Sequence, residues 1–285
     1  RARWAPLSRA PRHYCGTLPA LLVLALAARS TGLSDLRVSA GGGVTCAHAA
    51  WLAQAKCWGD NEFGQLGVGD VLDRGDHAHE MGDRLPYLQL GGDVRSVSSS
   101  GLHTCAVLEG GNVACVGYNA LGQLGTGDTV SYGARPRDLG TALPHVRLGA
   151  GEAAAEVHAS RHHTCARLRS GRVKCWGANH HGQLGVGDLL SRGVADVQMG
   201  DALAAVQMPP RHIGRAPAEI GLGSDGACAR FADDGSVVCW GATLRARGSR
   251  LGAGALVVPL GWGAFATSLD VAANVVCAVL ADGRV

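Results

Sequence analysis

The amino-acid sequence predicts an all-β fold made of repeated units. Glycine supplies 43 of the 285 residues without a Gly-X-Y period, and this excess is typical of many tight turns between short strands. A sequence unit of about 60 residues recurs along the chain, which indicates a solenoid, a propeller or an array. Cysteines also recur at the same places in successive units.

Hydrophobic content and charge limit the class of protein. Hydrophobic residues make up 47% of the chain, which is enough to form a buried core. The formal net charge is +3, and Lys and Arg are scattered rather than gathered into a stripe. We therefore expect no nucleic-acid partner.

The first 33 residues differ from the rest of the chain. They are basic up to His13, and Leu18–Ala28 is an apolar run, which together resemble a secretory signal peptide or a signal anchor. The apolar run is too short to span a bilayer. In the alternative interpretation, Leu18-Pro19 starts a repeat strand, like Leu85-Pro86 and Leu143-Pro144. We assign residues 1–33 to a signal-like or unassigned segment and residues 34–285 to the repeats.

Three motifs recur in the same order in each complete unit. They read H-T-C-A-x-L, V-x-C-W-G-x-N and G-Q-L-G-x-G-D, and they run from His103 to Asp128 and again from His163 to Asp188. An earlier copy ends at Asp70. The fourth unit has Gly226-Ala227 in place of His-Thr and Gly248–Gly252 in place of G-Q-L-G, so we expect it to be irregular.

These motifs resemble the regulator of chromosome condensation repeat, in its cysteine-bearing variety, over residues 34–285. The resemblance implies a β-propeller of about seven blades with about four antiparallel strands each, which acts on partner proteins through its faces. About four and a half units are present, so we expect part of a ring. The units are centred on Cys46/Cys57, Cys105/Cys115, Cys165/Cys175, Cys228/Cys239 and Cys277.

Each cysteine pair brackets a short segment, which predicts a disulfide across a hairpin. Two cysteines placed symmetrically about a turn face each other on adjacent antiparallel strands. The segment between Cys46 and Cys57 lacks a turn glycine, so we expect a longer and irregular loop there. The expected disulfides link Cys46 to Cys57, Cys105 to Cys115, Cys165 to Cys175 and Cys228 to Cys239, and they imply an oxidising compartment.

Two cysteines have no partner in this scheme, Cys15 and Cys277. The final residues Gly283-Arg284-Val285 match Gly171-Arg172-Val173, after which the repeat continues to a cysteine. We therefore expect the chain to be a fragment, with the partner of Cys277 beyond residue 285.

The tryptophan of the second motif occurs at Trp58, Trp176 and Trp240, and Val116 takes its place in the second unit. A repeated apolar position usually marks the core. We therefore expect these side chains to pack between units rather than to bind a ligand.

The sequence shows no pattern for metal, cofactor or catalytic chemistry. Zinc sites usually contain a C-x(2–4)-C knuckle, and none occurs. His103 and His163 share one slot of the repeat and lack a nucleophile and a carboxylate at triad spacing, which favours structural hydrogen bonds. Gly221–Gly226 matches G-x-G-x-x-G but precedes a repeat cysteine instead of joining a strand to a helix. We expect no enzyme activity, no cofactor and no metal.

The segments between the repeats are the expected site of function, because loops on a rigid scaffold carry recognition. They are residues 71–87, 129–145, 189–215 and 243–262. We expect a non-enzymatic protein-binding scaffold, secreted or on the lumenal or extracellular face, that binds its partner through loops on one propeller face. A membrane would be contacted only through a signal anchor. The candidate partner-binding residues are Asp73, Arg74, Asp76, His77, His79, Arg135, Arg137, Arg192, Met199, Arg211, Arg245 and Arg247.

Two other functions stay open. One is a guanine-nucleotide exchange factor for a small GTPase in the cytoplasm or nucleus, which the resemblance implies through the founding member of the family. The other is a lectin-like or hydrolytic propeller, for which the sequence shows no convergent polar site. A fold alone transfers neither function.

Overall fold

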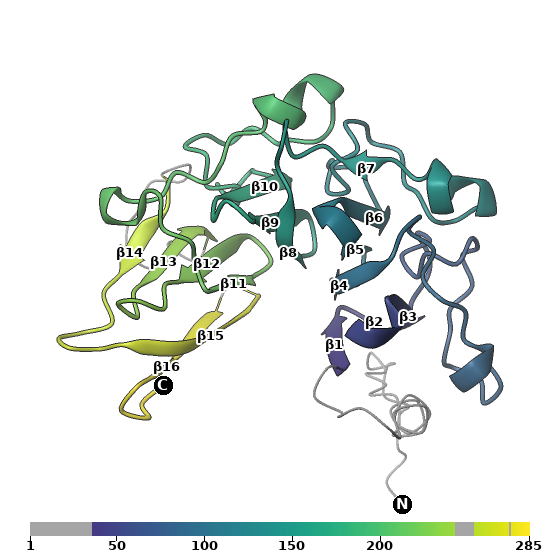
Figure 1. Cartoon of the computed structure of the whole chain (residues 1–285), viewed down its shortest axis with the longest axis horizontal. Coiled ribbons are helices and arrows are strands. Elements are labelled where there is room, and N and C mark those ends of the chain that lie inside the picture. The colour runs from purple at the N-terminus through teal and green to yellow at the C-terminus, as the bar shows by residue number, and fades with distance from the viewer. Residues whose placement is uncertain (1–35, 243–253, 274) are drawn as a thin grey trace, which may run out of the picture.

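The computed structural model describes residues 36–242, 254–273 and 275–285. These residues form five antiparallel sheets side by side along an open arc, with β1 at one end and β15 and β16 at the other (Figure 1). Each sheet is one blade of a partial β-propeller, which confirms the all-β prediction. No helix among these residues is long and apolar enough to cross a bilayer. The signal-like segment 1–33 and Cys15 lie outside the described residues.

The blades follow one another in chain order. Blade 1 holds β1 (Leu36–Gly41), β2 (Val44–Ala49) and β3 (Gln54–Gly59). Blade 2 holds β4 (Val94–Ser99), β5 (His103–Leu108), β6 (Val113–Gly117) and β7 (His145–Val146). Blade 3 holds β8 (Ala154–Ala159), β9 (His163–Leu168) and β10 (Val173–Gly177). Blade 4 holds β11 (Glu219–Leu222), β12 (Gly226–Arg230), β13 (Val237–Gly241) and β14 (Leu256–Val258), and blade 5 holds β15 (Ala266–Ala272) and β16 (Val275–Leu280).

Within each blade, consecutive strands are hydrogen-bonded neighbours. The first strands of successive blades, β1, β4, β8, β11 and β15, also contact one another, so they line the inside of the arc. Short 3-10 helices occupy turns and connections. They are η2 (Ala50–Leu52), η3 (Gly82–Arg84), η4 (Glu109–Gly111), η5 (Pro136–Asp138), η6 (Gly140–Ala142), η7 (Asp196–Gln198), η8 (Gly200–Ala202) and η9 (Pro210–His212).

The fourth strand is the weakest part of the predicted blade. It is a regular strand in blades 2 and 4, whereas in blades 1 and 3 it shrinks to isolated bridges, Lys56 to Tyr87 and Lys174 to Ala205. This strand lies at the outer edge of its sheet, and the chain leaves it within a few residues to start the next blade. Between one and three residue pairs form with it in blades 1 to 4.

The predicted disulfides are confirmed, because the strand register places each cysteine directly opposite its partner. Cys105 pairs with Cys115 and Cys165 with Cys175, each with 4.1 Å between the Cα atoms. The pairs Cys46–Cys57 and Cys228–Cys239 are linked in the same way. The first hairpin turns through η2 and then Ala53, whose φ of 53° does the work of a glycine, as the expected irregular loop requires. Closing a loop of this size stabilises a hairpin by about 3 kcal/mol.

The hydrophobic core is divided into layers, one between each pair of neighbouring blades. Trp176 and Trp240 are fully buried in two of these layers, which confirms their predicted packing role. The Trp176 indole Nε1 donates a hydrogen bond of 3.0 Å to the carbonyl of Gln123 in the preceding blade. Trp240 repeats this bond to the Gln183 carbonyl at 2.9 Å. Trp58 is only partly buried, since no described blade precedes it.

Gly125 lets the Trp176 indole rest directly on the preceding loop. A Cβ at Gly125 would lie 2.6 Å from Trp176 Nε1, and its φ is +69°. Gly140 has a similar φ of +63°, but a Cβ there would meet no atom within 4 Å. Both Gly→Ala substitutions therefore carry the backbone penalty, and only the first adds a clash. We expect Gly125→Ala to lower the free energy of unfolding by about 1–3 kcal/mol more than Gly140→Ala in denaturant titrations. Equal losses would contradict this packing.

Candidate functional site

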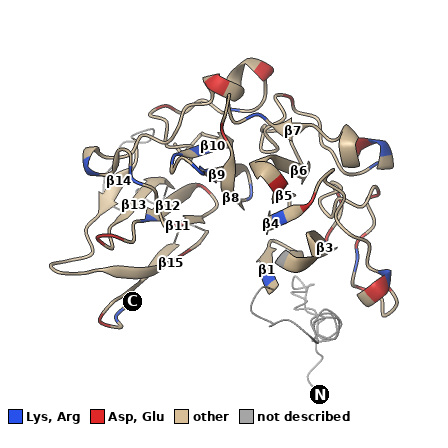
Figure 2. Cartoon of the chain, viewed as in Figure 1, with Lys and Arg blue, Asp and Glu red and all other residues tan. Residues whose placement is uncertain are grey.

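Three long loops emerge at one edge of the arc. In an antiparallel sheet, the turn after the first strand and the connection after the third strand lie at the same edge. The loops are residues 60–86, 118–144 and 178–204, which we call the loop face. Their 3-10 helices lie on the outer rim in Figure 1. Asp, Glu, Lys and Arg gather mostly in the connections rather than in the strands, with both signs mixed (Figure 2).

Each loop folds around one buried asparagine. In blade 2, Asn119 Nδ2 donates to the carbonyls of Asp128 and Val130 at 3.0 and 2.9 Å, and Leu124 N donates to Asn119 Oδ1 at 2.9 Å. The Asp128 carboxylate in turn accepts from Val130 N at 2.9 Å. The same bonds recur around Asn61 and Asn179. Satisfied buried amides hold a segment in one conformation, so these loops are rigid.

The loops belong to the repeat, which the sequence interpretation missed by treating them as variable connectors. Residues 70–86, 128–144 and 188–204 align without a gap. Their shared framework consists of Gly75, Gly133 and Gly193, then Gly82, Gly140 and Gly200, then Leu85, Leu143 and Leu203. Aligning the three segments with one another, without gaps, would have revealed that the loops are part of the repeat. The hydrophobic pattern does not reveal it, because polar groups determine the conformation of the loops.

Two predicted partner-binding arginines have partners inside the loops. Arg74 and Arg192 bind the carboxylates of Asp70 and Asp188 at 2.6 Å, four residues earlier. In the middle loop the Tyr132 hydroxyl fills this slot and donates to Asp128 at 2.9 Å. The side chain at this position therefore stabilises the loop. A role of Arg74 and Arg192 in partner binding stays a prediction.

Met199 is not available to a partner in this structure. It is 4% exposed and packs in the core layer between blades 2 and 3 with Leu203. Leu139 fills the same slot in the previous loop and is also buried. The expectation of a surface methionine is thus corrected: the slot faces inward in both loops.

The other predicted residues do not converge. Asp73 accepts a bond of 2.8 Å from Asn61 N, and Arg135 donates to Asp138 at 2.9 Å. Arg137 and His79 occupy equivalent exposed positions on different loops. Arg211 is exposed in the connection from blade 3 to blade 4, at the edge opposite the loop face. Arg245 and Arg247 lie outside the described residues.

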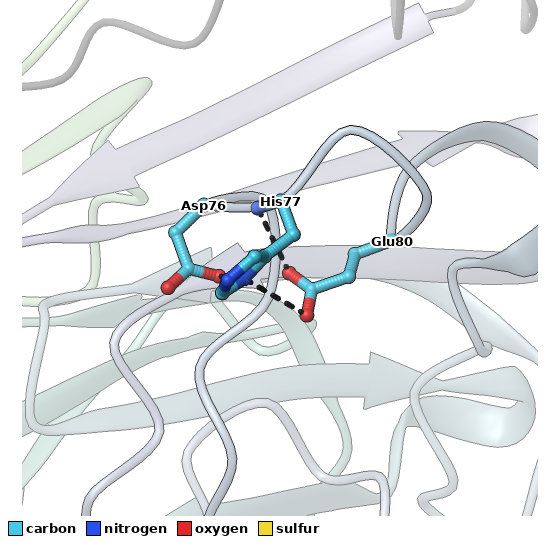
Figure 3. A group of neighbouring side chains, drawn as sticks. All are labelled: Asp76, His77 and Glu80. Atoms are coloured by element: carbon cyan, nitrogen blue, oxygen red, sulfur yellow. Dashed lines mark hydrogen bonds and ion pairs between the residues drawn. The ribbon is translucent and has the colours of Figure 1, made fainter.

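Asp76, His77 and Glu80 lie close enough to hold an ion, as Figure 3 shows. Glu80 Oε2 already accepts from Gly75 N at 2.9 Å and His77 N at 3.3 Å. In the third loop, the neutral amide of Gln198 braces the same turn by accepting from Val194 N at 3.1 Å. The hydrogen bond to Asp76 raises the pKa of His77. Loop bracing accounts for this geometry without a metal.

His103 has the structural role that the repeat predicted. Thr164 donates its hydroxyl to the Gln123 carbonyl at 2.8 Å, so His103 Nε2 is the donor in its 2.8 Å bond to Thr164 Oγ1 of the next blade. Ser100 Oγ lies 3.2 Å from His103 Nδ1. Burial lowers the pKa of His103 to about 3, so the ring is neutral.

His163 departs from the prediction, because neither of its ring nitrogens has a hydrogen-bond partner among the described residues. The slot that Thr164 fills for His103 is Ala227 here, since each stands opposite the tryptophan of its own blade. Burial again lowers the pKa to about 3. Between blades 1 and 2 the histidine is the group that is missing. Val44 stands in its place, and the Thr104 hydroxyl has no hydrogen-bond partner among the described residues. Among the described blades, the bond from histidine to threonine therefore forms only between blades 2 and 3.

His212 and Ser236 form a second histidine–hydroxyl pair that the sequence did not reveal. Their Nε2 and Oγ atoms are 2.8 Å apart, and Ser236 donates to Asp234 at 2.6 Å. His212 Nε2 is therefore the donor, while its Nδ1 is buried without a partner. A general base would need to accept the serine proton and to be oriented through Nδ1. The pair therefore holds η9 against the turn that contains Asp234 and Ser236.

A cavity of about 530 Å³ lies where the turns after the first strands converge at the centre of the arc. Small residues and backbone line it, including Ser100, Ser160 and Ser224. Arg161 is the one charged residue in the lining. The serines and Arg161 are the polar and charged side chains among the described residues of the lining.

Repeated blades, four of which carry a disulfide across their central hairpin, define the class: a β-propeller repeat protein. The chain contains regulator of chromosome condensation (RCC1) repeats, which match residues 94–123 and 156–183. The four disulfides fit the cysteine-bearing variety.

The chain aligns with only part of each similar protein. The human protein named "Probable E3 ubiquitin-protein ligase HERC4" is 34% identical over 170 residues, which are 56% of this chain and 14% of that protein. The mouse "Regulator of chromosome condensation" is 29% identical over 144 residues, 50% of this chain and 30% of the relative. The crystal structure of Prp20p from Saccharomyces cerevisiae has a TM-score of 0.59 at 16% identity, covering 86% of this chain and 56% of the other. This last likeness is one of fold.

Restoring the missing partner of His163 should stabilise the chain. Ala227→Thr places a hydroxyl in the slot that Thr164 fills for His103, and a buried hydrogen bond contributes about 1 kcal/mol. Ala227→Val adds the same bulk without the hydroxyl, so the difference between the two variants isolates the bond. We expect Ala227→Thr to unfold at higher denaturant concentration than Ala227→Val. A threonine variant no more stable than the valine variant would refute this assignment.

Proposed function

We propose that the chain is a non-enzymatic scaffold that binds a protein partner through the loop face. The observation that carries this proposal is the repeated asparagine framework, which fixes three loops in one conformation while their solvent-facing positions differ. Glu62, Ala120 and His180 occupy one such exposed slot and differ in chemistry, whereas the exposed slot of Leu72, Val130 and Leu190 stays aliphatic. A fixed backbone with variable side chains supports recognition, because little conformational entropy is lost on binding.

The histidine chemistry favours binding over catalysis. His103 and His163 are fully buried, and their lowered pKa values leave them neutral at physiological pH. His212 serves as a donor to Ser236. None of these three rings is placed to remove a proton from a substrate.

For the compartment, we propose an oxidising one, with the protein secreted or facing the lumen or cell exterior. Four hairpins place cysteines in opposed register, and the sequence begins with a signal-like segment. Non-reducing peptide mapping of protein trapped with alkylating reagent at lysis tests this. We expect each linked pair, including Cys105–Cys115 and Cys165–Cys175, to be recovered as one disulfide. Free thiols at all four pairs would place the chain in a reducing compartment.

The main rival is a guanine-nucleotide exchange factor. The resemblance to the founding member of the family implies it, and the crystal structure of Prp20p, a yeast protein of similar fold, was described together with its binding properties to Gsp1p and histones. This rival predicts faster nucleotide release from a small GTPase. A lectin-like or hydrolytic activity has no structural observation in its favour.

A photo-crosslinking residue at Val130, on the loop face, tests the scaffold function in cells. The matched control places the same residue at Arg211, which is exposed at the opposite edge. We expect mass spectrometry to find a partner attached at position 130 and not at 211. Attachment at 211 alone, or at neither position, would overturn the use of this face. A small GTPase attached at 130, with stimulated nucleotide release, would favour the rival.

A further inference from the structure

Two segments of each loop lie side by side and form one strip of the loop face. In blade 1, Asn61 N donates to Asp73 Oδ1 at 2.8 Å, and Asn61 Nδ2 donates to the Leu72 carbonyl at 3.1 Å. These bonds join residues 60–63 to residues 71–73. In blades 2 and 3 the serines Ser131 and Ser191 accept the equivalent backbone bond at 3.2 and 3.3 Å. The strip therefore has the same backbone in all three blades.

The strip presents a row of exposed aliphatic side chains. Leu72 is 63% exposed and Leu190 is 67% exposed, although the asparagine network fixes the backbone of both residues. The other members of the row are Val71, Val130 and Leu189. Apolar side chains that are held in place and open to water are typical of a binding surface. We call these five residues the aliphatic row.

The blade 1 end of the row is strongly acidic. Residues 60–86 contain seven acidic and two basic residues, whereas residues 118–144 contain two of each and residues 178–204 contain three and one. Asp60, Glu62 and Asp73 have no ion-pair partner among the described residues, since Arg74 is bound to Asp70. Burial raises the pKa of Asp60, and the nearby charges of Asp73 and Glu62 raise it further. Carboxylates thus crowd together here without a cation.

A partner that binds here must complement both the aliphatic row and the acidic residues at its blade 1 end. The surplus of carboxylates repels nucleic acid and acidic segments and attracts Lys and Arg. The row towards blade 3 offers only apolar contact, which suits aliphatic side chains. The acidic slots occur in blade 1 alone: Asp60, Glu62 and Asp73 correspond to Tyr118, Ala120 and Ser131 in blade 2. The charge is therefore polarised along the strip.

We propose that the aliphatic row binds an extended peptide segment of a protein partner, with its Lys or Arg residues over Asp60, Glu62 and Asp73 and its aliphatic residues over Val130, Leu189 and Leu190. This proposal rests on the scaffold function and names the chemistry of its partner. It also gives the bound segment a direction along the arc.

The probe is a random 12-residue peptide library displayed on phage and selected on the purified chain, with its disulfides intact. We expect the selected peptides to combine Lys or Arg with Leu, Ile or Val. The affinity of the best synthetic peptide is then measured by fluorescence anisotropy. It should weaken as salt is raised, because exposed charges are screened.

The variants use substitutions that the repeat itself accepts. Glu62→Ala with Asp73→Ser gives blade 1 the side chains of blade 2, so the backbone bond from Asn61 is kept. Leu190→Asp breaks the aliphatic row at its blade 3 end, away from the acidic residues of blade 1. Val197→Asp is the matched control, since Val197 is 82% exposed on the outer rim and outside the row. We expect a loss of about tenfold or more in peptide affinity for the first two variants, against less than about twofold for the control.

Several outcomes would overturn the proposal. These are a selection that enriches no common sequence, peptides without basic residues, or equal affinity of the chain and the Leu190→Asp variant for the selected peptide. If position 130 still crosslinks to a partner in cells, the scaffold function stands and only this assignment of chemistry fails. If crosslinking also fails, both fail.

Discussion

The hydrogen bond from a tryptophan indole to the glutamine carbonyl of the preceding blade couples the stacking of the blades to the conformation of the loops. It is possible only because a glycine in the left-handed region, Gly125 or Gly185, leaves the loop surface bare for the ring. The glutamine belongs to the same motif as the loop framework. Blade stacking and loop conformation are therefore specified together, and a change in one is transmitted to the other.

Elements governed by local spacing were predictable from the sequence. Cysteines placed symmetrically about a turn fixed the register of four hairpins, and the recurrence of tryptophan identified the core between blades. The loops were harder, because their order comes from Asn119 and its equivalents bonding to carbonyls up to eleven residues away. Such bonds leave no hydrophobic period. Met199 illustrates the consequence, since it looks like a surface residue of a loop and is a core residue of the repeat.

The candidate site was predictable in place and not in composition. That the loops carry function stays a prediction, and the charged residues chosen for it include several that brace the loops. Arg74, Arg192 and Arg135 all bind carboxylates within their own loops. The exposed aliphatic residues beside them drew no attention, because a single exposed leucine in a sequence is unremarkable. Only the fold shows that five such residues share one strip.

The unequal seams between blades have a consequence for how the arc comes apart. In a linear array of units that touch only their neighbours, the weakest junction sets where cooperativity ends. Blades 2 and 3 share both the indole bond and the bond from His103 to Thr164, and blades 3 and 4 share the indole bond. Blades 1 and 2 have neither bond, since Val44 and Val116 stand in place of the histidine and the tryptophan. We therefore expect the arc to open first between blades 1 and 2, so that amide hydrogens of blade 1 exchange through smaller openings than those of blades 2 and 3.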